Sequence, residues 1–263
     1  MWNPYQELPS GTRRGLGIGS VSLVLVIWAV LSGLSLVAKA KLPAPWECID
    51  AFIQLAWDVE KGESLLWLAT KASVMRVLVA GVVVCLIGIP VGILMGASPK
   101  VNSALSPLVD PFRSAPIVAI QPVMVMWFGI DELSKILFLF LGAVVYLIPM
   151  VRDAMQAVPR TYYISARDLG ASPWEAIRHA VIPMAMPRIA DGVIVSISVM
   201  WTYITVAEYV NAKVGLGQLI ANSKRFSSMP KVFVGIFVIV ALALITYAGM
   251  TWLKKKLFPW EAT

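Results

Sequence analysis

The sequence predicts an all-α polytopic membrane protein, and three observations support that fold class. Of its 263 residues, 59% are hydrophobic and only 14% are charged, whereas soluble domains carry about a quarter charged residues. The mean hydropathy is correspondingly high, at +0.78. Six apolar segments, each near the ~20 residues that a helix needs to cross a bilayer, lie at residues 16–38, 70–96, 104–127, 133–156, 186–210 and 232–253. We therefore expect six transmembrane helices within a single domain, residues 1–263.

The first apolar segment, residues 16–38, is predicted to be a retained transmembrane helix. Arg13 and Arg14 precede it, as basic residues precede the apolar part of a signal peptide. However, the segment is longer than the roughly 7–15 apolar residues of a signal peptide. Lys39 and Lys41 then follow it.

Residues 41–65 are predicted to form an amphipathic helix at the extracytoplasmic interface. Acidic side chains are interspersed there with Trp46 and Trp57, and tryptophan favours the boundary between hydrocarbon and water. This helix and the first span make up an N-terminal part, residues 1–64, ahead of a core at residues 65–260.

The second apolar segment carries Gly88, Gly92 and Gly96 at intervals of four residues. Small residues on one stripe of a membrane helix allow a second helix to approach closely. We interpret the stripe as a packing seam within the chain, in preference to a ligand site.

The third apolar segment, residues 104–127, is interrupted by proline, which frees backbone carbonyls inside a span. Such broken helices occur where they line a cavity or are buried against protein. The prolines are Pro107, Pro111, Pro116 and Pro122. Asp110 and Arg113 are spaced three residues apart and can pair with each other. We interpret them either as a self-satisfied ion pair near the cytoplasmic edge or as part of a gate.

The fifth apolar segment presents a polar stripe along one helical face, formed by Ser198, Trp201, Thr205 and Glu208. A polar stripe on a span avoids lipid and faces the bundle interior or a water path. Two interpretations of Glu208 stay open. Its carboxylate either lies near the outer surface, satisfied by water or a neighbouring helix, or contributes to a gate or substrate path.

The turn after this segment contains Gly215, Leu216 and Gly217, and its glycines can support positive φ. We expect it outside the membrane. There it is either an ordinary connector or a docking surface for a solute-binding protein.

A polar stretch at residues 158–183 separates two apolar segments and predicts two short helices hinged at Gly170 and Ala171. Ser172 and Glu175 form a capping box with proline at the first helical position, so a helix is expected to restart there. A helix-turn-helix left in water between two membrane spans requires a partner surface on which to dock.

The second of these short helices is expected to end at Pro183 and Pro187. Trp174 and Ile177 lie three residues apart on one of its faces, with Ala171 beside them. They predict a small apolar knob that fits a groove of a partner.

This polar stretch resembles the cytoplasmic coupling loop of bacterial ABC importer permeases. The pattern of that loop is Glu-Ala-Ala, three residues, Gly, nine residues, Ile, one residue and Leu-Pro. Ala166, Gly170 and Pro183 match it in register. Four positions depart from it: Ile164 replaces Glu, Ser165 replaces Ala, Ala180 replaces Ile and Ile182 replaces Leu.

Other motifs are similar to the nitrate, sulfonate and taurine branch of the same family. They lie at residues 88–96, 127–136, 206–208 and 215–217. Their order and spacing are specific, and the resemblance spans roughly residues 65–260. It implies the type I ABC importer permease (MetI-like) fold.

The resemblance also implies partners. Two copies would enclose a translocation path, and each coupling loop would sit in a groove of one of two ABC ATPase subunits, which bind ATP and Mg. An extracytoplasmic binding protein would deliver solute near residues 215–217. The expected coupling residues are Ala166, Arg167, Asp168, Gly170, Ala171, Ser172, Trp174, Glu175, Ile177, Arg178 and Pro183. The expected path or gate residues are Arg113, Ser198, Trp201, Thr205 and Glu208.

The positions of the basic residues predict how the chain is oriented across the membrane, by the positive-inside rule. Arg13, Arg14, the arginines of residues 158–183 and the lysines at 254–256 all fall on one side of the six predicted spans. We therefore expect both termini and the coupling loop in the cytoplasm, and a location in the bacterial inner membrane.

Several classes of function lack their motifs. There is no phosphate loop of the Gly-x-x-x-x-Gly-Lys-Ser/Thr type, so the chain is not expected to hydrolyse ATP. His179 has no companions for metal binding or nucleophilic catalysis. We expect no catalytic residue, metal or bound cofactor. The net charge of +7 does not indicate nucleic acid, because the basic residues form no patch with interleaved aromatic residues.

The sequence thus favours the transmembrane subunit of an ATP-driven importer. The resembling branch implies a small anion such as nitrate, a sulfonate, taurine or bicarbonate. Arg113 favours an anion and Glu208 an amine-bearing solute, so an organic nitrogen compound or a vitamin precursor stays open. An ion-coupled secondary transporter would require inverted repeats, and a membrane enzyme would require an acid/base or metal cluster; neither is visible.

Overall fold

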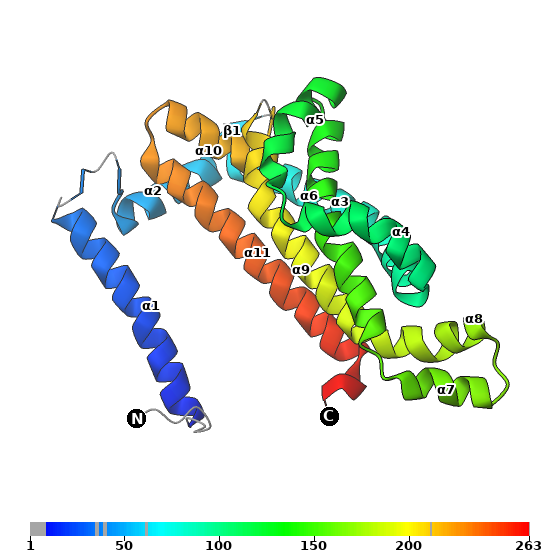
Figure 1. Ribbon diagram of the computed structural model, residues 1–263. Helices are drawn as coiled ribbons and strands as arrows, with labels where there is room; N and C mark the ends of the chain where they lie inside the picture. The colour runs from blue at the N-terminus through cyan, green and yellow to red at the C-terminus, as the bar shows by residue number, and fades with distance from the viewer. Residues whose placement is uncertain (1–8, 35–36, 39–40, 61–62, 211, 263) are drawn as a thin grey trace.

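The computed structural model describes residues 9–34, 37–38, 41–60, 63–210 and 212–262, and these residues are almost entirely helical. Long helices run through the molecule, and shorter elements gather at its two ends (Figure 1). One end, here called the elbow end, carries α7 (Arg160–Asp168), α8 (Pro173–Ala176), the start of α1 (Ser10–Gly33) and the end of α11 (Met229–Leu257). The opposite end carries α2 (Pro45–Trp57), α5 (Gln121–Phe128) and α10 (Leu216–Arg225).

Three helices form the core. α3 (Leu65–Ala97) packs along α6 (Glu132–Gln156), and α6 packs along α9 (Ile182–Tyr209). Their facing side chains are apolar and fully buried, as at Phe138 and Leu147. Lipid tails are as apolar as these side chains, so close van der Waals packing, and not the exclusion of water, holds such helices together in a membrane protein.

The glycine stripe of α3 is confirmed as a seam within the chain. Its contacts are Gly88 with Leu147, Gly92 with Val151 and Gly96 with Met155. A Cβ atom at Gly92 would lie 2.5 Å from the Cβ of Val151 and 2.8 Å from the carbonyl oxygen of Ile148. Because the residue numbers rise together on both sides, α3 and α6 run parallel.

We expect Gly92→Ala to lower the free energy of unfolding by about 1–3 kcal/mol, because the added methyl group forces the backbones of α3 and α6 apart. Chemical unfolding in detergent micelles, followed by circular dichroism, measures the change. Gly81→Ala is the matched control, because a Cβ there meets nothing closer than Ile197 Cδ1 at 3.7 Å. Equal stability of the two variants would contradict the seam.

The third predicted span is not a continuous helix. Residues 99–128 form α4 (Pro99–Val109), the 3-10 turns η1 (Asp110–Arg113) and η2 (Ile117–Ile120), and α5. Prolines stand in the first turn of α4, η1 and α5 and supply no amide hydrogen, so short helices start anew instead of continuing. Within the described residues, five helices are long and apolar enough to cross a membrane, in place of the six that the sequence predicts.

The break between α8 and α9 that the prolines predict is wrong. Residues 173–209 form one helical run, in which a π-helical turn, η3 (Ile177–Val181), joins α8 to α9. Pro183 closely follows the π-helical turn and lies inside this run, where it cannot donate a backbone hydrogen bond to the preceding turn. Pro187 is accommodated inside α9.

The N-terminal part lies beside this bundle. α1 is the most exposed of the long helices, with Trp28 against Phe233 and Phe237 of α11. The helix predicted within residues 41–65 is confirmed as α2, which covers residues 45–57 and which Glu47 caps through the backbone N–H of Ala44. Its place at a membrane interface stays a prediction. Two short antiparallel strands, of two residues each, connect α2 to α3. They are β1 (Val59–Glu60) and β2 (Glu63–Ser64), and the sequence did not indicate them.

Candidate functional site

The first candidate site is the elbow, residues 160–181. It is formed by α7, α8, the turn between them and the π-helical turn η3. Gly170 makes that turn with φ of +93°, a conformation that side chains other than glycine rarely adopt. Ser172 then caps α8: its Oγ accepts the N–H of Glu175, and the Glu175 carboxylate accepts the N–H of Ser172. The predicted turn at Gly170 and the capping box are both confirmed, whereas the role of the turn as a hinge stays a prediction.

Apolar side chains of the elbow face outward. Leu169 is 89% exposed and Trp174 is 51% exposed. These two residues are here called the exposed pair. The predicted knob of Trp174 with Ile177 is wrong in its second member, because Ile177 packs against the core. Exposed apolar residues that cluster on one polar element indicate a docking surface.

The other predicted coupling residues surround the exposed pair. Those that are exposed are Arg167, Asp168, Gly170, Ser172, Glu175, Arg178 and Pro183. Those that are half-buried are Ala166 and Ala171. Arg167 Nη1 donates to the carbonyl oxygen of Ala171, which ties the end of α7 to the start of α8. The elbow is therefore internally braced.

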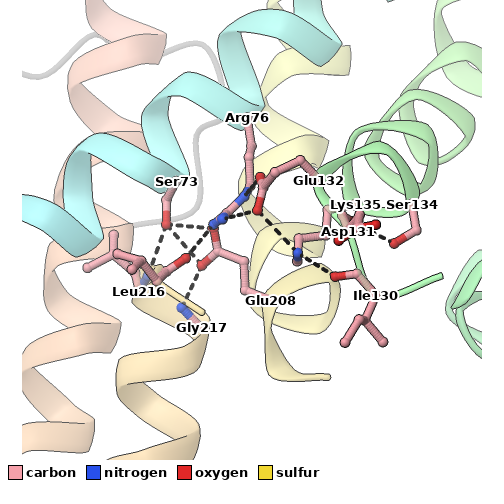
Figure 2. Close-up of polar contacts among 11 residues, drawn as sticks. Ser73, Arg76, Ile130, Asp131, Glu132, Ser134, Lys135, Glu208, Leu216 and Gly217 are labelled. Atoms are coloured by element: carbon pink, nitrogen blue, oxygen red, sulfur yellow. Dashed lines mark hydrogen bonds and ion pairs between the residues drawn. The ribbon is translucent and has the colours of Figure 1, made fainter. Parts of the chain in front are cut away.

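The second candidate site is a buried polar cluster at the opposite end. Glu208, near the end of α9, is completely buried. Its carboxylate accepts hydrogen bonds from Ser73 Oγ at 2.7 and 2.9 Å, from Arg76 Nη1 at 2.6 Å and from the N–H of Gly217 at 2.8 Å (Figure 2). These donors and the guanidinium charge compensate the carboxylate for the water it has lost. Of the two interpretations of Glu208, satisfaction by a neighbouring helix is what the geometry supports.

Arg76 joins this cluster to α6. Its Nε and Nη2 donate to the two carboxylate oxygens of Glu132 at 2.6 and 2.8 Å, and its Nη1 also donates to the carbonyl oxygen of Val214. Lys135 donates to Glu132 at 3.2 Å. Sequence reasoning missed Arg76, although a lone arginine inside an apolar segment requires a carboxylate partner and could have signalled the pair.

The turn at residues 215–217 is folded into the cluster. Gly215 has φ of +154°, and a Cβ there would lie 2.5 Å from Glu208 Cδ and 2.7 Å from Arg76 Nη1. The N–H of Leu216 donates to Ser73 Oγ at 2.9 Å. The predicted tight turn is confirmed, but all three residues are buried. Their contact with a binding protein stays a prediction.

The remaining path candidates do not share one site. Ser198 and Thr205 donate to carbonyl oxygens of their own helix. Trp201 is 4% exposed, and its Nε1–H has no hydrogen-bond acceptor among the described residues. The predicted pairing of Asp110 with Arg113 is wrong, because Asp110 accepts from Arg152 Nη1 of α6 at 2.9 and 3.0 Å, whereas Arg113 is exposed.

Among the residues with described positions, no three His, Cys, Asp or Glu side chains gather closely enough to hold an ion. The two cysteines, Cys48 and Cys85, are free thiols.

Comparison with known proteins identifies one family. Residues 88–259 match the family described as binding-protein-dependent transport system inner membrane component. The taurine transport system permease protein TauC of Escherichia coli (strain K12) is 32% identical over 96% of this chain and 92% of its own length. The putative aliphatic sulfonates transport permease protein SsuC of Bacillus subtilis (strain 168) is 30% identical over 95% of this chain and 88% of its own length.

Solved structures share the fold. An inward-facing structure of the MetNI methionine ABC transporter has a chain that superposes with a TM-score of 0.65. It covers 73% of this chain and 96% of that chain, at 20% sequence identity. A bacterial ABC transporter involved in the import of the acidic polysaccharide alginate superposes with a TM-score of 0.57, over 93% of this chain and 96% of that chain at 16% identity.

Proposed function

The chain belongs to the family of binding-protein-dependent transport system inner membrane components, and from that premise we propose how it works within an ATP-driven importer. It is an ABC transporter permease and not itself an enzyme. As a dimer it would enclose the path for a solute. Two separate ATPase subunits would supply energy, with ATP and Mg bound to them, and an extracytoplasmic binding protein would deliver the solute.

Six crossings of the inner membrane fit the helix directions better than five. α3 and α6 run parallel along the glycine seam, so residues 98–131 have to return from the elbow end to the opposite end. α1 starts and α11 ends at the elbow end (Figure 1), which requires an even number of crossings. The broken segment α4–α5 would therefore be the sixth crossing. Because α4 and η1 have no buried residue in the single chain, a second copy of the permease or a water-filled path would have to cover this segment, as broken membrane helices require.

The cytoplasmic side would be the elbow end. Arg13, Arg14 and the lysines at 254–256 lie there together with the arginines of the elbow, and basic residues concentrate on the cytoplasmic side of membrane proteins. This assignment puts both ends of the chain and the exposed pair in the cytoplasm.

The observation that carries the proposal is the elbow, a braced polar projection that exposes Leu169 and Trp174 beyond the apolar bundle. Each exposed pair would occupy a groove of one ATPase subunit. Closure of the ATPase dimer would move the two elbows toward each other and rock the bundles between inward-facing and outward-facing states.

The helical run Pro173–Tyr209 would transmit this motion. Its 37 residues, at ~1.5 Å rise per residue, reach roughly 55 Å. Trp174 lies near its first residue and Glu208 near its last. A push on the elbow would therefore act on the polar cluster at the opposite end, which joins α9 to α3 and α6 through Arg76.

For the substrate we propose a small organosulfonate. Two relatives that match over nearly the whole chain are permeases for taurine and, putatively, for aliphatic sulfonates. A vitamin precursor is the second candidate, since a riboflavin transport system permease protein of Chloroflexus aurantiacus is 29% identical over 62% of this chain. Nitrate, bicarbonate or another organic nitrogen compound would be alternatives within the same importer type.

Uptake by the reconstituted importer tests this function. Permease, ATPase and cognate binding protein in proteoliposomes should accumulate taurine or an alkanesulfonate only with ATP on the ATPase side. Riboflavin is the comparison solute. Accumulation that persists without the ATPase would contradict the ABC mechanism. ATP-dependent uptake of riboflavin, without uptake of taurine or an alkanesulfonate, would contradict the proposed substrate class.

A further inference from the structure

A cavity of about 520 Å³ lies at the opposite end of the molecule, away from the elbow. Residues from α2, the start of α3, α10 and the start of α11 line it. Its volume falls within the roughly 300–1,000 Å³ of small-molecule sites. Neither the polar stripe of α9 nor the elbow contributes a side chain to its wall.

The wall is apolar on one part and basic on another. Leu55, Leu68 and Leu219 are its aliphatic lining residues, and Lys213 and Lys231 are its basic lining residues. No Asp or Glu side chain belongs to the lining residues. The cavity therefore combines a surface for a hydrocarbon chain with two positive charges.

Of the two lysines, Lys213 is exposed and Lys231 is half-buried, and both differ from the buried or partly buried cations of this chain. Arg76, Arg152 and Lys254 each form an ion pair with a carboxylate. In the described part of the chain, Lys213 and Lys231 form neither an ion pair nor a hydrogen bond. Two lysines without a carboxylate partner on one concave wall create a positive potential that attracts an anion.

Neutral hydrogen-bonding groups complete this wall. Gln218 and Asn222 lie on the α10 face that lines the cavity, and Ser228 precedes α11. Amide and hydroxyl donors beside ammonium groups suit the several acceptor oxygens of a sulfonate or phosphodiester.

We propose that this cavity binds an amphiphilic anion, a tetrahedral oxyanion carried on an aliphatic chain. The oxyanion lies against Lys213 and Lys231, and the chain lies against the leucines. Two sources share this chemistry: a soluble alkanesulfonate and an anionic phospholipid of the outer leaflet. The inference does not rest on the identity of the transported solute, because binding here requires neither ATP nor transport.

Binding to the full-length permease tests the site. The protein is placed in nanodiscs of phosphatidylcholine, and hexane-1-sulfonate is titrated by calorimetry. A parallel sample contains phosphatidylglycerol, whose retention by the protein is measured by native mass spectrometry. The variant Lys213→Gln/Lys231→Gln should bind either probe about tenfold more weakly or worse, as expected for the loss of hydrogen bonds to charged groups.

Two variants keep the test interpretable. Lys224→Gln/Arg225→Gln removes the same charge at the exposed end of α10, outside the lining, and should bind like the unmodified protein. Lys213→Arg/Lys231→Arg should retain binding. Sulfonate binding alone assigns a soluble ligand, and phosphatidylglycerol binding alone assigns a lipid. The proposal is overturned if neither probe binds, or if the two glutamine variants behave alike.

Discussion

Arg76→Met is expected to lower the free energy of unfolding by about 3–5 kcal/mol, because it strands a buried carboxylate. Glu208 is completely inaccessible to solvent, and Arg76 supplies the only positive charge among its described hydrogen-bond partners. The remaining donors, Ser73 and the N–H of Gly217, are neutral. The methionine side chain fills much of the volume of arginine but contributes no charge.

A second substitution separates the lost charge from lost packing. Arg76→Met/Glu208→Gln removes the stranded charge, while the glutamine oxygen can still accept the N–H of Gly217. We expect the double variant to be more stable than Arg76→Met alone by at least ~1 kcal/mol, as coupled residues are non-additive.

Urea unfolding in detergent micelles, followed by tryptophan fluorescence, measures all of these stabilities. Lys71→Met is the matched control. Lys71 lies on the same helix, but its pair with Glu63 is long, at 3.9 Å, and exposed, so its loss should cost at most about 1 kcal/mol. A double variant that is no more stable than Arg76→Met would show that the uncompensated charge of Glu208 is not the cause of the destabilisation.

Leu169→Ala/Trp174→Ala is expected to weaken association with the cognate ATPase by about 2 kcal/mol or more, roughly 30-fold in Kd. Both side chains are exposed on the elbow. An aromatic residue that fills a partner's pocket typically contributes most of an interface's binding energy. Biolayer interferometry with the permease in nanodiscs and the soluble ATPase measures the loss.

The control for this prediction is Phe226→Ala. Phe226 is 78% exposed but lies just after α10, at the opposite end, so its removal should leave ATPase binding unchanged. Unaltered binding by the elbow variant, or an equal loss in Phe226→Ala, would contradict the assignment of the exposed pair.

Local signals predicted much of the fold. Long apolar segments predicted α1, α3, α6, α9 and α11, because a helix satisfies its own backbone in hydrocarbon. The capping box at Ser172 and the glycine at position 170 predicted the elbow turn, since both features depend on neighbouring residues alone. The glycine stripe predicted close packing, but it could not name α6 as the partner.

The features that sequence reasoning missed depend on contacts between distant residues. Arg76 and Glu208 are 132 positions apart, so a lone arginine in an apolar segment indicates that a carboxylate partner exists but not which residue it is. Asp110 has Arg113 within reach on its own segment, yet Arg152 of α6 binds it. The helix continues through the expected break by way of the π-helical turn at residues 177–181, which closely precedes the proline pair in α9.

Sidedness of the elbow tests the central claim most directly. Leu169→Cys, in a background with Cys48→Ala and Cys85→Ala, is treated with a membrane-impermeant maleimide in intact spheroplasts and in inverted vesicles. Phe226→Cys serves as the probe of the opposite end. We predict that Leu169→Cys reacts only in inverted vesicles, and less so once the ATPase is bound, whereas Phe226→Cys reacts only in spheroplasts. Labelling of Leu169→Cys in spheroplasts would place the elbow outside the cell and contradict its role in coupling.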